Sequence, residues 1–165
     1  MIAEAGHLFM IIVFALSILQ IFVPTYGIVS HNDKMITATS TIALFAAGFV
    51  VAAFLALMHG FVTSDFSIVL VAEHSHSSKP MIYKISGLWG NHEGSLLLWI
   101  LVLCLFGAVL AARFQTMPVR FKARILGVQG VIASAFLAFS LFTSNPFARL
   151  ANAPLDGRGL NPVLQ

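Results

Sequence analysis

The sequence predicts an all-α integral membrane protein with about four transmembrane helices, a long outer loop and an irregular outer C-terminal tail. Of its 165 residues 59% are hydrophobic and only 9% are charged, and the mean hydropathy is +0.94. A soluble domain keeps about a quarter of its residues charged, so this chain has too few charges to cover a water-exposed surface. Four stretches are apolar enough to span a bilayer: residues 8–29, 37–58, 96–112 and 125–142.

The lengths of the apolar stretches separate spans from other segments. A helix needs about 20 apolar residues to cross the hydrocarbon core, and about 17 to 25 are tolerated, so all four stretches fit. The first is expected to remain as an anchor, because the chain begins with an acid and without the basic residues that precede a cleaved signal peptide. Residues 66–72 are apolar but too few to cross, and we expect them to form an extended piece of loop at the surface.

Basic residues predict the orientation of the spans. The connector between the third and fourth stretches contains Arg113, Arg120, Lys122 and Arg124. Short loops rich in Lys and Arg stay on the cytoplasmic side of the membrane. We therefore expect this connector and the turn with Lys34 to lie inside, and both termini and residues 60–94 to lie outside.

The same residue types argue against several function classes. The basic residues form no face with interleaved aromatic side chains, so nucleic acid is not an expected partner. Cys104 is the single cysteine, and neither C-x-x-C nor C-x-x-C-H occurs. No Asp, Glu, Lys or Arg lies in the core of a span, which disfavours an ion-coupled transporter. His-Ser-His at 74–76 lacks a surrounding cluster of further ligands, so we expect no metal site.

Residues 89–99, Trp-Gly-Asn-His-Glu-Gly-Ser-Leu-Leu-Leu-Trp, are the most specific segment on the expected outer face. A structural interpretation is that Asn91 caps the third span, that Glu93 suits the positive end of its dipole, and that tryptophans favour the membrane interface. The functional interpretation is a rim of aromatic and titratable side chains that contacts a flat, amphipathic ligand or a partner subunit: Trp89, His92, Glu93 and Trp99.

Further motifs run in order along the chain: Met-Ile-Ala-Glu-Ala-Gly-His-Leu at 1–8, Ser-Asp-Phe-Ser at 64–67, Tyr-Lys at 83–84, Ser-Asn-Pro-Phe at 144–147 and Asp-Gly-Arg-Gly-Leu-Asn-Pro at 156–162. Together with residues 89–99 they resemble the N-terminal part of the CcmF/NrfE family of cytochrome c maturation haem lyase subunits. The resemblance covers the whole chain and implies a complete N-terminus. Asn91 departs from the family, which usually has glycine there.

The resemblance implies that the parent protein attaches haem to apocytochrome c at the outer face of the bacterial inner membrane, or of a mitochondrial inner membrane. Its implied partners are a haem chaperone, apocytochrome c with a thiol-reducing protein, and membrane lipid. Family members are several times longer, and their iron-ligand histidines lie beyond residue 165. We therefore expect a fragment or split-gene piece that works with the remaining C-terminal portion and is inactive alone.

The tail, residues 145–165, should have no regular structure, because prolines such as Pro146 interrupt it. Arg149 and Arg158 would lie outside, against the usual charge bias. We expect one of them, Arg158, to lie near a haem propionate, because guanidinium binds carboxylate bidentately. The structural alternative is that these arginines pin the loop or lie at the lipid interface. A structural membrane subunit or a transporter fragment without haem chemistry is the alternative function.

Overall fold

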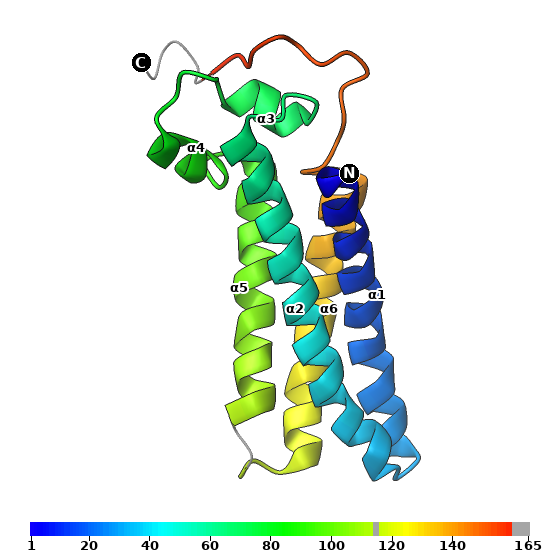
Figure 1. Ribbon diagram of the computed structural model, residues 1–165. Helices are drawn as coiled ribbons and strands as arrows, with labels where there is room; N and C mark the ends of the chain where they lie inside the picture. The colour runs from blue at the N-terminus through cyan, green and yellow to red at the C-terminus, as the bar shows by residue number, and fades with distance from the viewer. Residues whose placement is uncertain (114–115, 160–165) are drawn as a thin grey trace.

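A computed structural model describes residues 1–113 and 116–159 (Figure 1). Each of its four long helices is long and apolar enough to cross a membrane. The described residues contain no named strand, and their β pairing is limited to an isolated bridge between Ile68 and Arg149. The predicted all-α membrane fold is therefore confirmed. The helices are α1 (Ile2–Val29), α2 (Asp33–Thr63), α3 (Val69–His74), α4 (Met81–Gly87), α5 (His92–Arg113) and α6 (Val119–Phe142).

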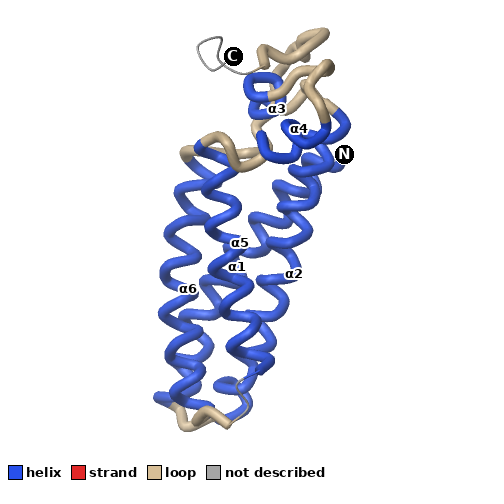
Figure 2. The backbone as a smooth tube through the Cα atoms, turned by 90° about the vertical axis from the view of Figure 1, so that its left-hand side faces the viewer, coloured by secondary structure: helices blue, strands red, loops and turns tan. Residues whose placement is uncertain are grey.

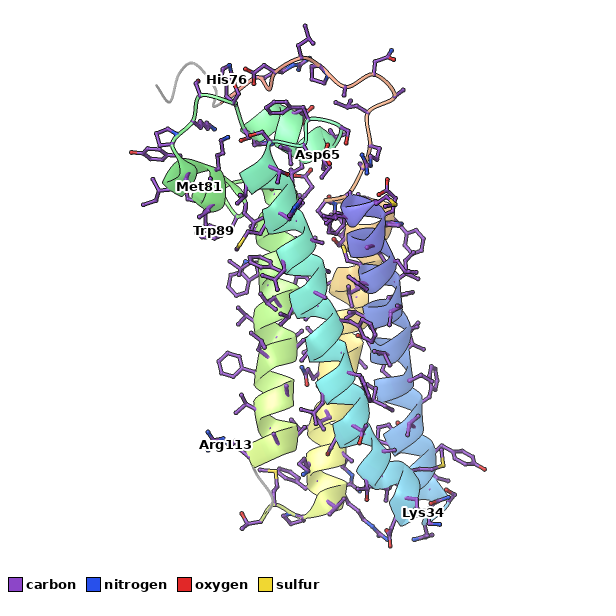
Figure 3. The ribbon with its side chains drawn as sticks, in the orientation of Figure 1. Lys34, Asp65, His76, Met81, Trp89 and Arg113 are labelled. Atoms are coloured by element: carbon purple, nitrogen blue, oxygen red, sulfur yellow. The ribbon has the colours of Figure 1, made fainter. Side chains whose placement is uncertain are left out.

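The four long helices form one bundle with two unlike ends. Helices α2 and α6 pack against each other and against both other long helices, and α1 and α5 flank this pair (Figures 1 and 2). Helices α3 and α4, the N-terminus and the described tail gather at one end, which we call the loop end. Lys34 and Arg113 lie at the opposite end, the turn end (Figure 3). The bundle therefore separates the two short, basic turns from the long loop.

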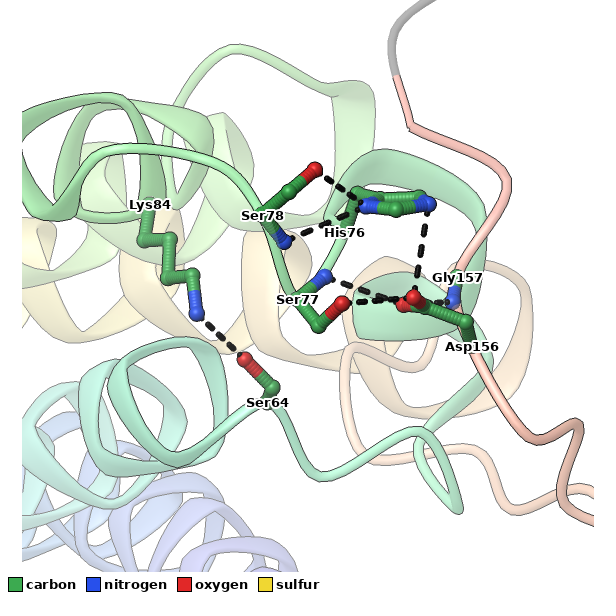
Figure 4. A network of polar contacts seen from close by, with 7 residues as sticks. All are labelled: Ser64, His76, Ser77, Ser78, Lys84, Asp156 and Gly157. Carbon is green, nitrogen blue, oxygen red and sulfur yellow. Dashed lines mark hydrogen bonds and ion pairs between the residues drawn. The ribbon is translucent and has the colours of Figure 1, made fainter.

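Helix α2 has defined signals at both of its ends. The Asn32 side chain accepts hydrogen bonds from the N–H groups of Lys34 at 3.1 Å and Met35 at 3.4 Å, which caps the first turn. The helix ends at Thr63, and the following cap residue, Ser64, has a φ of 54° in the left-handed region that commonly terminates helices. The buried Lys84 of α4 donates from Nζ to Ser64 Oγ at 2.7 Å (Figure 4). A cation thereby lies at the negative end of the α2 dipole.

Two glutamine side chains join three helices inside the bundle. Gln20 of α1 donates from Nε2 to the Leu126 carbonyl of α6 at 2.7 Å. Gln129 of α6 donates from Nε2 to the Leu103 carbonyl of α5 at 2.6 Å. A Cβ at Gly107 would lie 2.0 Å from Gln129 Oε1, so glycine leaves the room that this amide occupies. Polar groups at membrane depth thus satisfy one another across helices.

The long helices extend beyond the spans expected from hydropathy. Helix α1 begins at Ile2 instead of residue 8, and α2 continues to Thr63 instead of residue 58. Helix α2 has 31 residues, which rise about 46 Å, whereas the hydrocarbon core is about 30 Å thick. Polar residues such as Glu4 and His59 therefore lie on helical turns at the ends, where an apolar window stops but the helix does not.

The prediction for residues 66–72 was wrong, because this segment is not an extended loop at the surface. Helix α3 begins at Val69, and Ile68 and Val71 are fully buried. The tail covers them: the Val69 N–H donates to the Ala148 carbonyl at 2.9 Å, and the Leu150 N–H donates to the Ser67 carbonyl at 2.9 Å. The short length excluded a membrane-crossing helix, but it did not exclude a short helix covered by a distant segment.

Candidate functional site at the loop end

The segment 89–99 begins with a tightly built turn. Asn91 is buried, and its Oδ1 accepts a hydrogen bond from the Gly94 N–H at 2.6 Å while its Nδ2 donates to the Gly87 carbonyl at 2.7 Å. The predicted capping role of Asn91 is therefore confirmed. A Cβ at Gly94 would lie 1.6 Å from the Leu88 carbonyl oxygen, so glycine is required at that position. Asn91 itself has no positive φ, and the turn does not need glycine there.

The four expected rim residues differ in exposure and in their contacts. His92 is exposed, and its ring meets Phe139 of α6 edge-on with 6.0 Å between centroids. Trp89 and Trp99 are exposed by 43% and 68%. Glu93 is partly buried at the first turn of α5. Across residues 1–113 and 116–159, no hydrogen bond or ion pair joins the side chains of any two of them, so the rim stays a prediction.

Backbone hydrogen bonds attach the tail to α3. The Arg158 N–H donates to the Ala72 carbonyl at 2.7 Å, and the Gly159 N–H donates to the Ser75 carbonyl at 3.1 Å. A Cβ at Gly157 would lie 2.0 Å from the Ser75 oxygen, so this approach also requires glycine. Residues 160–165, which include the end of the 156–162 motif, lie outside the described residues. The described tail is irregular, as expected, but it is held in place.

The carboxylate of Asp156 fastens the tail to the loop after α3 (Figure 4). It accepts hydrogen bonds from the Ser77 hydroxyl at 2.5 Å, the Ser77 N–H at 2.9 Å and the Gly157 N–H at 2.8 Å. These donors, with the Ser77 hydroxyl first, and the nearby His76 lower the pKa of the Asp156 carboxyl. His76 Nδ1 accepts the Ser78 N–H at 3.2 Å, so the proton of the neutral ring lies on Nε2, 3.4 Å from Asp156 Oδ2.

The two tail arginines have different environments. Arg149 donates to Glu4 Oε1 at 2.5 Å and also to the Ser67 hydroxyl, so it pins the tail to α1 and to the loop. The Arg158 side chain is exposed, and its guanidinium has no hydrogen bond or ion pair with any residue that the structure describes. The pinning interpretation therefore fits Arg149, and no such contact holds the Arg158 guanidinium within the described residues.

Two hollows flank α3 at the loop end. One, of about 210 Å³, is lined by Arg158, Leu150 and Glu73 among others. The other, of about 170 Å³, is lined by Glu93, Asn145 and the same Glu73. Both are smaller than the roughly 300–1,000 Å³ that pockets for drug-sized ligands typically enclose. Such hollows can receive an edge or a carboxylate of a large flat ligand but cannot enclose it.

Of the predicted residues, Glu93 and Arg158 line the hollows, and three further residues that shape this region were not predicted as site residues. Glu73 lines both hollows, Ser77 binds the carboxylate of Asp156, and Lys84 fixes α4 to the end of α2. The Ser77–Asp156 contact joins positions 79 apart, so no local spacing signals it. Lys84 carried a weak signal, since it belongs to the Tyr-Lys motif.

Comparison with known proteins identifies relatives over the whole chain. A family model described as Cytochrome C assembly protein matches residues 89–165. The cytochrome c-type biogenesis protein CycK of Bradyrhizobium diazoefficiens is 49% identical over 165 residues, which are 100% of this chain and 25% of the relative. CcmF of Escherichia coli is 37% identical and NrfE of Haemophilus influenzae is 34% identical, each over 100% of this chain and 26% of the relative.

A solved structure shares the fold. The chain superposes on a structure titled Cytochrome c Heme Lyase CcmF with a TM-score of 0.82 at 22% identity, over 92% of this chain and 26% of that chain. The chain thus spans about a quarter of the length of the curated relatives that it matches. The four-helix bundle and its loop end are therefore a shared part of larger proteins.

Proposed function

We propose that this chain, whose residues 89–165 match the family model for cytochrome c assembly proteins, forms part of a membrane haem lyase that attaches haem to apocytochrome c. The relatives are named as cytochrome c-type biogenesis proteins, and they match this chain from end to end. Since it spans a quarter of their length, the activity belongs to this chain together with a portion equivalent to the remainder. That portion supplies the iron ligands, and it receives haem from a chaperone and apocytochrome c from a thiol-reducing partner.

The proposed location is the bacterial inner membrane, with the loop end on the periplasmic side. Lys34, Arg113 and Arg120 lie on the helix ends that border the two short connections at the turn end, and short basic connections stay in the cytoplasm. The loop end then lies where exported apocytochrome is found. Its hollows open on the side from which haem and apocytochrome would arrive.

The observation that carries the proposal is the position of Arg158, which lines the 210 Å³ hollow. The Arg158 guanidinium forms no hydrogen bond or ion pair with any residue in the described part of the chain. Backbone hydrogen bonds fix Arg158 and Gly159 to α3 and to Ser75 directly after it, so the Cα position of Arg158 is defined. A guanidinium offers two parallel N–H donors to a carboxylate, and haem presents carboxylates on its propionates. Haem supplies the carbons to which the apocytochrome thiols become bonded, and Arg158 would hold its propionate edge.

Glu73 restricts how this anion could bind. Its carboxylate lines the same hollow as Arg158, so an anionic ligand must approach from the arginine side to avoid repulsion. Glu93 carries the same sign into the neighbouring hollow. Both carboxylates thus favour one orientation of a flat ligand, with its propionate toward Arg158. His92, the first residue of α5, would complete the wall.

The proposal is tested by reconstituting maturation from two pieces. The chain would be produced with the remaining portion of Escherichia coli CcmF in cells that lack their own CcmF, and covalently bound haem would be measured on a reporter cytochrome c. We expect restored yield, and lower yield with Arg158→Ala, His92→Ala or Glu93→Ala at unchanged protein level. Arg120→Ala removes an exposed arginine at the turn end and serves as the charge-matched control.

The outcomes separate the proposal from its alternatives. If both pieces accumulate together and no haem is attached, the chain is a structural membrane subunit and not a working part of a lyase. If maturation is restored but Arg158→Ala behaves like Arg120→Ala, the chain serves as a scaffold and the propionate contact is wrong.

A further inference from the structure

Helix α4 and the turn after it present an apolar patch at the loop end. We define the α4 patch as four side chains with large exposed fractions: Met81 at 52%, Ile82 at 71%, Tyr83 at 58% and Trp89 at 43%. The neighbouring apolar residues of α3 are, in contrast, buried beneath the tail. No described segment covers the α4 patch. Large apolar side chains that gather on one surface usually mark a contact with a partner or a membrane.

The patch is held rigidly from behind. Lys84, on the same short helix, is buried and bonded to Ser64 at the end of α2. Leu88 is fully buried, and Asn91 donates to the Gly87 carbonyl at 2.7 Å. Lys84, Leu88 and Asn91 therefore face the protein, while the four side chains of the α4 patch face away. A segment fixed in this way presents a permanent surface.

The height of the patch along the bundle matches a membrane interface. Helix α5 starts at His92, three positions after Trp89, and has 22 residues. Its rise is about 33 Å, close to the roughly 30 Å of the hydrocarbon core, so its first turn lies near one interface. Met81 and Trp89 lie on the flank beside the start of α5, whereas His76 lies on the far surface of the loop end (Figure 3). Lipid headgroups would surround the bundle at that height.

We infer that the α4 patch is an interfacial anchor that lies in the headgroup region of the lipid bilayer. Tyr83 and Trp89 are the residue types enriched in aromatic belts, because an apolar ring and a polar tip suit that zone. Met81 and Ile82 would contact the start of the acyl chains. Through the Lys84–Ser64 contact, this anchor sets the height of the α2 end, and of the loop that follows it, relative to the membrane surface. The inference does not depend on haem chemistry.

The two tryptophans of the chain permit a direct test. Trp99→Phe leaves Trp89 as the sole indole, and Trp89→Phe leaves Trp99. Each variant of the full chain would be reconstituted in phosphatidylcholine vesicles whose acyl chains are brominated either near the headgroup or near the chain end. We expect Trp89 to be quenched more strongly by the shallow bromines. Trp99 lies about 10 Å further along α5 and should be quenched more strongly by the deep ones.

A matched pair of substitutions tests the patch itself in the Trp99→Phe background. Ile82→Asp should weaken the shallow quenching of Trp89, whereas Leu155→Asp, at a fully exposed position of the tail, should leave it unchanged. The inference is overturned if Trp89 with the native patch is unaffected by either brominated lipid, since water or another protein segment then covers it. Stronger quenching of Trp89 by the deep bromines would also overturn it. The comparison of shallow and deep quenching of Trp89 in the Trp99→Phe variant leaves the patch intact. It therefore tests the inference even if Ile82→Asp fails to fold.

Discussion

The guanidinium of Arg149 lies 2.5 Å from the carboxylate of Glu4, and this ion pair joins the tail to the first turn of α1 across 145 positions. Arg149 also donates to the hydroxyl of Ser67, which in turn donates to Asp65 at 2.5 Å. Three segments far apart in the sequence thus meet beside α3. The position of the hollows depends on this meeting, because the tail forms one wall of each.

Removing Arg149 should loosen the tail. In Arg149→Ala, the N–H groups of Val69 and Leu150, which pair loop and tail, should exchange with solvent faster, because their segments lose the ion pair with Glu4. The rise should be modest, since exposed ion pairs contribute little. Hydrogen exchange in detergent micelles measures it. Arg158→Ala is the control, and equal effects of the two substitutions would contradict the distinction between the arginines.

Acid should release the tail from the loop at Ser77. The pKa of Asp156 is lowered by hydrogen bonds from Ser77 and Gly157 and by His76. The contribution of Asp156 to holding the tail on the loop is therefore fully present at pH values above its unfolded-state pKa. That unfolded-state value is about 3.9 for aspartate. The contribution should vanish as the pH falls below it through the lower folded-state pKa. The mobility of a spin label at Leu155→Cys, with Cys104→Ala, should rise over that range.

Two variants identify the source of this pH dependence. Asp156→Asn should make the label mobility high and independent of pH in the acid range. His76→Gln removes the only titratable ring beside Asp156 in the described part of the chain and should leave the acid transition in place. A transition that persists in Asp156→Asn would show that another carboxyl group controls the tail.

Gly94 and Gly48 form a matched pair in two long helices. A Cβ at Gly94 would lie 1.6 Å from a backbone carbonyl oxygen, whereas a Cβ at Gly48 would have no neighbour within 4 Å. Gly94→Ala should therefore cost about 1–3 kcal/mol of unfolding free energy. Gly48→Ala should be neutral or slightly stabilising, because alanine favours helix. Steric trapping in bicelles measures both, and equal stabilities would contradict the close approach of Gly94 to Leu88 in the turn before α5.

The orientation of the bundle can be tested with an impermeant maleimide. With Cys104→Ala, Ser78→Cys at the loop end should be labelled from the periplasmic side. Thr116→Cys at the turn end should react only after the inner membrane is permeabilised, because basic turns stay in the cytoplasm. Labelling of both cysteines from the periplasmic side would contradict a four-span bundle with its two ends on opposite sides of the membrane.

Local patterns predicted the parts of the fold that are locally determined. The four helices follow from continuous hydropathy, and the start of α5 follows from the capping residue Asn91. Helix α3 could not be predicted, because the covering of its apolar residues depends on Ala148 and Leu150. The same limit applies to the site. Arg158 was proposed from its charge, but only the structure distinguishes it from Arg149, whose partner Glu4 is at the other end of the chain.

The most direct test of the central claim is haem retention by the purified assembly of this chain with the remaining CcmF portion, measured as haem absorbance per protein. Arg158→Ala should lower retention, Arg158→Lys should restore part of it through charge without the bidentate geometry, and Arg120→Ala should match the unsubstituted assembly. Equal retention in all four assemblies would contradict a haem contact at Arg158.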